Sequence, residues 1–61
     1  MKEIQQAYSG FFSSTGLARI SAFCEFVTML YMARDTMTAE EADACDRMYL
    51  EMHVAEPFLT A

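Results

Sequence analysis

Residues 24–33 read CEFVTMLYMA, and only Glu25 and Thr28 could serve a hydrophilic side if this stretch forms a helix. A helix that is apolar nearly all round is normally covered on all sides by other parts of a protein. The fold therefore depends on what covers the apolar surface of this segment.

The size of the chain limits how much cover it can supply. With 61 residues, it forms one domain at most and buries only about 60% of the surface that its unfolded form exposes. Small scaffolds usually need disulfides, a metal or a partner to exceed roughly 3–5 kcal/mol of stability. The two cysteines, Cys24 and Cys45, lie inside apolar helical patterns, which favours buried, reduced thiols; a disulfide between two helices is the alternative.

Apolar residues at helical spacing predict an all-α domain over residues 1–61, with helices at about 2–13, 16–34 and 38–55. The expected buried face of the first helix consists of Ile4, Ala7, Tyr8, Phe11 and Phe12. On the second helix it consists of Leu17, Ile20, Phe23, Cys24, Val27, Leu30 and Tyr31. The back of the second helix carries Phe26, Met29 and Met32, which we expect to be uncovered and to form an apolar interface, with self-association as the simplest cover.

The third helix has the clearest start signal. TAEE, residues 38–41, has the form of a capping box, in which Thr38 and Glu41 exchange hydrogen bonds between side chain and backbone. The apolar stripe that follows is Ala42, Cys45, Met48, Tyr49 and Met52, and Pro57 is expected to end the helix near residue 55 or 56. The short connection RDTM predicts an antiparallel hairpin of the second and third helices. We therefore expect a bundle of two to three helices built on this hairpin, which forms a dimer.

The charge is negative and uneven. The net charge is −5, made up of +1 over residues 1–34 and −6 over residues 35–61. Such a chain repels nucleic acid, because neutralising phosphate needs clustered Lys and Arg, and it attracts a basic protein surface.

The acidic residues of the third helix suggest a binding surface. We expect Glu40, Asp43, Asp46 and Glu51 to form an acidic face, and Leu50 and Val54 project from the same sector. A polar rim around exposed apolar side chains is typical of protein interfaces. The alternative is a solvated surface whose first-turn carboxylates complement the helix dipole.

The sequence favours no enzyme, metal or cofactor. Cys45 and His53 are too far apart on one helix to share a metal ion. Acidic neighbours of Cys45 oppose a reactive thiolate, and a 61-residue helical domain offers no cleft for a substrate.

A cytoplasmic location without membrane insertion is expected. The apolar run over residues 20–33 has 14 residues and includes Glu25, whereas a spanning helix needs about 20 apolar residues. The N-terminal segment MKEIQQAY does not have the form of a signal peptide.

Two resemblances bear on function. The segment AEEADACDRM, residues 39–48, is similar in rhythm to the second helix of plasmid copy-control RNA-binding hairpins. The RNA contacts of that family lie on a lysine-bearing first helix, where this chain offers only Arg19 and Arg34, so RNA binding is not implied. In size and acidity the chain resembles small phage-borne inhibitors such as anti-CRISPR proteins.

We accordingly expect an interaction module, a phage or mobile-element inhibitor that occludes a basic nucleic-acid-handling partner. The alternative is a homo-oligomeric structural or regulatory hairpin, in which the acidic face only solvates the protein.

Overall fold

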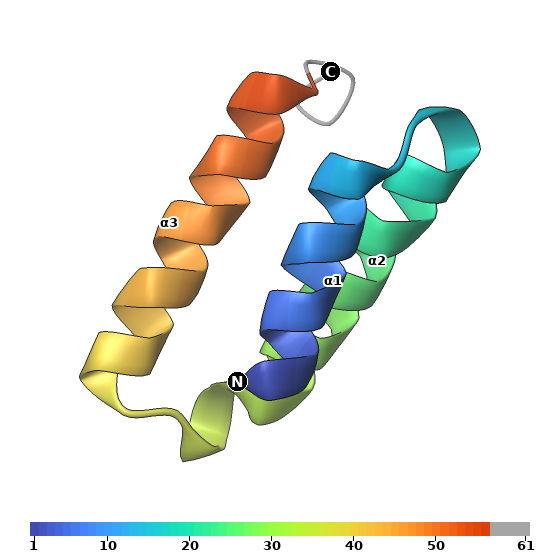
Figure 1. Ribbon diagram of the computed structural model, residues 1–61. Coiled ribbons are helices and arrows are strands. Elements are labelled where there is room, and N and C mark those ends of the chain that lie inside the picture. The colour runs from blue at the N-terminus through green and yellow to red at the C-terminus, as the bar shows by residue number, and fades with distance from the viewer. Residues whose placement is uncertain (57–61) are drawn as a thin grey trace.

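The structure is a computed structural model that describes residues 1–56, and it confirms the all-α prediction. Over these residues the helices are α1 (Lys2–Ser13), α2 (Gly16–Ala33) and α3 (Ala39–Ala55), with a 3-10 turn, η1 (Arg34–Thr36), between α2 and α3. Each predicted helix boundary lies at or next to the observed one. The chain runs up α1, down α2 and up α3 (Figure 1). The predicted C-terminal tail from Pro57 onward lies outside the described residues.

The start of α3 is the predicted capping box. The Thr38 hydroxyl accepts from the backbone N–H of Glu41 at 3.1 Å, and the Glu41 carboxylate accepts from the backbone N–H of Thr38 at 3.0 Å. At the other end, α3 stops at Ala55, and Glu56 is extended with φ −134°. A residue before a proline is disfavoured in the helical conformation, and Glu56 is accordingly non-helical.

Arg19 ties the three helices together at one end of the bundle. Its Nε donates to the carbonyls of Phe11 at 3.1 Å and Ser14 at 3.0 Å, where α1 ends. Its guanidinium also lies 4.9 Å from the centre of the Phe11 ring and 3.6 Å from the Glu56 carboxylate after α3. Gly16 makes the turn between α1 and α2, with a left-handed φ of 60° that suits glycine.

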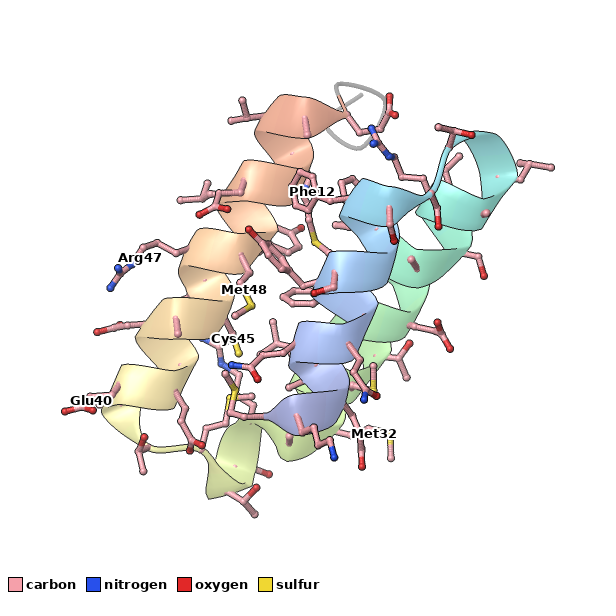
Figure 2. All side chains as sticks on the ribbon, viewed as in Figure 1. Phe12, Met32, Glu40, Cys45, Arg47 and Met48 are labelled. Carbon is pink, nitrogen blue, oxygen red and sulfur yellow. The ribbon has the colours of Figure 1, made fainter. Side chains whose placement is uncertain are left out.

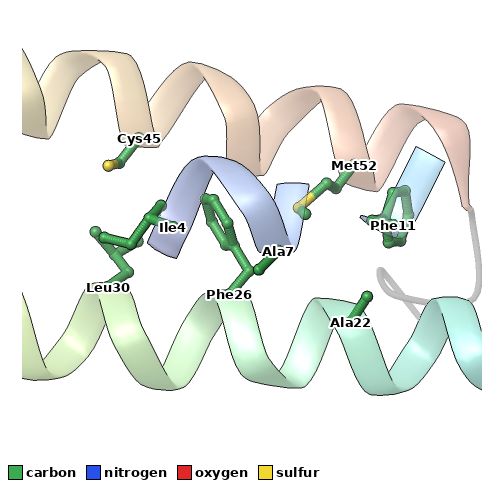
Figure 3. Close-up of a cluster of buried hydrophobic side chains, with 8 residues drawn as sticks. All are labelled: Ile4, Ala7, Phe11, Ala22, Phe26, Leu30, Cys45 and Met52. Carbon is green, nitrogen blue, oxygen red and sulfur yellow. The ribbon is translucent and has the colours of Figure 1, made fainter. Parts of the chain in front are cut away.

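The core lies where the three helices meet, and Figure 3 shows its eight buried side chains. They are Ile4, Ala7 and Phe11 from α1, Ala22, Phe26 and Leu30 from α2, and Cys45 and Met52 from α3. Most of the packing between helices is between α1 and α2, and α2 makes few direct contacts with α3, so the expected bundle built on a hairpin of the second and third helices is not confirmed. The small buried side chains of Ala7 and Ala22 allow α1 and α2 to approach closely.

The buried face of α2 differs from the predicted one. Phe26, expected at an uncovered interface, is fully buried in the core and cannot reach a partner. Leu17 and Tyr31, expected in the core, are 84% and 82% exposed. The reason is that α2 is apolar on both sides, so hydrophobicity does not select the buried face, and the fit against α1 does.

The predicted faces of α1 and α3 are closer to the structure. On α1, Phe12 is 41% exposed and Tyr8 is half-buried, while the other expected residues are buried. On α3, Cys45 and Met52 are buried and Met48 is half-buried against them.

The two cysteines lie in different environments. Both are free; Cys45 is buried, whereas Cys24 is exposed, contrary to the expectation that both would be buried. The Cys45 thiol donates to the sulfur of Met1 at 3.6 Å. Burial raises the pKa of the Cys45 thiol above its usual range, which opposes formation of the reactive thiolate.

Candidate protein-binding surfaces

The predicted acidic face is partly occupied by contacts within the protein. Asp46 lies 3.7 Å from Arg34 in an exposed ion pair, which contributes little to stability. Glu51 accepts a hydrogen bond from the Tyr8 hydroxyl. This bond, followed by burial and the negative charge of Glu51, raises the pKa of Tyr8. Two of the four predicted carboxylates are therefore engaged in contacts within the protein.

Glu40 and Asp43 are the other two carboxylates of this face, and both are exposed. Among the described residues, neither has a recorded ion pair or side-chain hydrogen bond. Glu40 and Arg47 point away from the bundle, whereas Cys45 and Met48 point toward α1 (Figure 2). Arg47 thus places a positive charge within the acidic face. The carboxylates that make no contact among the described residues, those of Glu40 and Asp43, lie near the start of α3.

The apolar residues predicted on the outer side of α3 form a shallow hollow. Leu50 and Val54 are 63% and 82% exposed. With Glu51 and Ala55 they line an open hollow of about 330 Å³, which Phe12 of α1 completes. Phe12 packs edge-on against Phe11 and Tyr8, each at 5.0 Å between ring centres, so its position is fixed by the core.

Sequence reasoning missed the contribution of Phe12 to this hollow. Phe12 lies next to the buried Phe11 in an apolar helical pattern, and the pattern alone assigns both to the core. A helix buries a limited arc, and Phe11 occupies its centre here. Whether Phe12 lies inside or outside that arc depends on where α3 packs, and the sequence pattern does not give this.

A second apolar surface runs along α2. Leu17, Ile20, Cys24 and Tyr31 are all exposed, and the half-buried Val27 lies between them in the same pattern. This set, which we call the α2 stripe, was predicted to be core. In the sequence, the spacing of 3 and 4 residues indicates a continuous apolar stripe along the helix. It does not indicate whether the stripe faces the core or the solvent.

The methionines predicted at an interface lie on a third side of α2. Met32 is exposed and points away from the bundle (Figure 2). Met29 is half-buried and packs against the core, and both line a hollow with Met1 and Ile4 of the N-terminal segment. Met32 remains available to a partner, but Met29 is largely used within the fold.

His53 is used for packing. Its ring lies 5.4 Å from that of Phe23 and 4.4 Å from that of Tyr49 between ring centres. The buried Nε2 atom has no hydrogen-bond partner. Over residues 1–56 no group of three or more His, Cys, Asp or Glu side chains could hold a metal ion.

The length and composition of α2 also match those of a membrane-spanning helix. Residues 16–36 are long and apolar enough to cross a membrane by length and composition alone, with a mean hydropathy of 1.2 over an 18-residue segment of which 11% is buried. This helical stretch is longer than the 14-residue apolar run seen in the sequence, because the helix includes flanking polar residues. One such helix is weak evidence for a membrane span, because the mostly buried core helix of a soluble protein and a signal sequence near the N-terminus pass the same test.

Comparison with known proteins adds no relative. No protein family matches the chain, and neither a curated protein nor a solved structure is significantly similar to it. A function must therefore be argued from the surfaces described above.

Proposed function

We propose that the protein is a protein–protein interaction module that uses the outer side of α3 to bind a partner with a basic surface. The observation that carries the proposal is the hollow formed by Phe12 of α1 with Leu50 and Val54 of α3. Glu40 and Asp43, whose carboxylates are free, lie on α3 as well. An exposed apolar centre with charged residues beyond it has the composition of a protein interface.

Charge determines the class of partner. The α3 half of the chain, residues 35–61, carries −6, so a basic protein surface is attracted over a long range. The apolar hollow would receive one or two apolar side chains of that partner. Nucleic-acid-handling proteins present basic surfaces of this kind, and occlusion of such a surface is the proposed activity.

The proposed biological role is that of a cytoplasmic inhibitor borne by a phage or mobile element, comparable with anti-CRISPR proteins. Its support is the small size and the acidity of the chain, together with free thiols that suit a reducing compartment. Neither a cofactor nor catalysis is part of the proposal.

The proposal is tested by reversing the charge of carboxylates on which the fold does not depend. Glu40→Lys with Asp43→Lys reverses the free carboxylates, and the matched control, Glu25→Lys with Asp35→Lys, makes the same change in net charge elsewhere on the surface. Tagged wild type and both variants are used to capture host proteins, which are quantified by mass spectrometry. We expect that wild type and the control variant both capture a basic host protein. The Glu40→Lys, Asp43→Lys variant should capture about ten-fold less of this protein, or less still.

A second pair of variants tests the apolar hollow. Leu50→Ser with Val54→Ser should weaken binding of the purified captured protein, measured by calorimetry, whereas Met32→Ser should not. Added salt should also weaken binding, because exposed charges are screened. Capture of no basic protein, or equal capture by the α3 variant and its control, would contradict the proposal.

A further inference from the structure

We propose that two copies of the chain associate by antiparallel packing of their α2 helices through the α2 stripe, with Cys24 at the two-fold axis. This surface shares no residue with the hollow on α3, so the inference stands independently of the proposed function.

The geometry of α2 supports a helix-to-helix contact. At about 100° per residue, the residues of the stripe fall within an arc of about 80° on the helix. Their order is Leu17, Ile20, Cys24, Val27 and Tyr31, with alternate steps of 3 and 4. This is the spacing by which two helices interdigitate along a common seam.

The stripe is nearly symmetric about its centre. Leu17 and Tyr31 lie equally far from Cys24 along the helix, one before it and one after it. A two-fold axis through Cys24 therefore places Leu17 of one copy against Tyr31 of the other. The same axis places Ile20 of one copy between Val27 and Thr28 of the other. The stripe is therefore complementary to itself, as a two-fold interface requires.

The charge distribution favours a second copy on this surface. The charged residues of α2, Arg19 and Glu25, fall outside the arc of the stripe, and Arg19 is engaged with α1 and Glu56. Residues 1–34 carry +1, so α2 helices meet without the repulsion that two −6 halves would create.

The available area is sufficient for a weak, specific contact. Leu17 and Tyr31 are more than four-fifths exposed. Since one aromatic side chain covers about 150–250 Å², the stripe and its edges offer on the order of 500 Å² per copy. A pair would bury on the order of 1,000 Å² in total, which is the lower end of specific interfaces.

A lipid surface fits the stripe less well. Interfacial helices that lie on membranes carry Lys and Arg on their polar face. The polar side of α2 carries Glu25 and no lysine, and the whole chain is negative, as are most membrane surfaces.

Sedimentation and substitution test the contact. Sedimentation velocity from about 1 to about 200 µM should show a monomer that becomes a dimer as concentration rises, as expected for an interface of this size. Leu17→Glu and Tyr31→Glu each bring an unpaired charge into the seam and should raise the dissociation constant by about ten-fold or more. Met32→Glu and Val54→Glu are matched controls at similarly exposed sites and should leave the dissociation constant unchanged. Circular dichroism checks that all four variants stay folded.

Cross-linking tests the orientation. Oxidation by dioxygen with copper phenanthroline removes two electrons and two protons from a pair of thiols, and should join two wild-type chains through Cys24 but not two Cys24→Ser chains. In the Cys24→Ser background, Leu17→Cys mixed with Tyr31→Cys should form a covalent heterodimer, whereas Leu17→Cys alone should not cross-link through position 17.

Three results would overturn the inference. The first is a strict monomer at every concentration. The second is a dimer that survives both Leu17→Glu and Tyr31→Glu, or one in which Leu17→Cys cross-links to itself. The third is a monomer that floats with vesicles of phosphatidylcholine and phosphatidylglycerol and loses this property on Tyr31→Glu, which would assign the stripe to a lipid surface.

Discussion

At the scale of single residues, Arg19 makes more structural contacts than its place in the sequence indicates. In the sequence it is one polar interruption in an apolar helix. In the structure it satisfies two carbonyls at the end of α1, covers the Phe11 ring and pairs with Glu56. Helix ends leave carbonyls without partners within the helix, and the Nε–H of Arg19 is shared between two of them.

Replacing Arg19 should therefore destabilise the fold strongly. Arg19→Met keeps the aliphatic stem but removes the charged donors, and we expect a loss of about 2–3 kcal/mol in the free energy of unfolding. Urea denaturation followed by circular dichroism measures it. Arg47→Met removes an exposed arginine and should change stability by less than about 0.5 kcal/mol. Equal effects of the two substitutions would show that Arg19 does not join the helices.

At the scale of elements, the start of α3 is defined locally. Thr38 and Glu41 each satisfy a backbone N–H of the other, and this exchange needs no tertiary contact. For this reason the start of α3 was predictable, whereas its packing partner was not.

Removing the cap should cost about 1 kcal/mol of stability. Thr38→Ala deletes the acceptor for the Glu41 N–H, and we expect a lower urea midpoint with an unchanged slope of the transition. Thr38→Ser keeps the hydroxyl and should retain most of the stability. A Thr38→Ala protein as stable as the Thr38→Ser protein would mean that the cap contributes nothing.

At the scale of the whole molecule, Tyr8 and Glu51 join the first and last helices across 43 residues of sequence. The pKa of Tyr8 is raised in the folded state. The stabilisation from this hydrogen bond is therefore fully present below the unfolded-state pKa of about 10, and it is lost as pH rises through the folded-state pKa.

Alkaline unfolding should show this dependence. Wild type should be more stable than Tyr8→Phe at pH about 8, and the difference should disappear as the pH rises above the unfolded-state pKa of about 10 and through the raised folded-state pKa of Tyr8. Urea denaturation at each pH measures the difference, and tyrosinate absorbance follows the ionisation directly. Glu51→Gln keeps a hydrogen-bond acceptor without the charge, so it should lower the pKa of Tyr8. A stability difference between wild type and Tyr8→Phe that is independent of pH would contradict this account.

Over residues 1–56 the sequence by itself determined where the helices begin and end and how α3 is capped, because these depend on local spacing, capping residues and Pro57. It also indicated that the outer side of α3 carries Leu50 and Val54 among carboxylates. Tertiary structure decided which side of CEFVTMLYMA is buried. Both sides of α2 are apolar, so their transfer from water is similarly favourable. The close fit of Ala22 and Phe26 against α1 then selects one of them and leaves Leu17, Cys24 and Tyr31 on the surface.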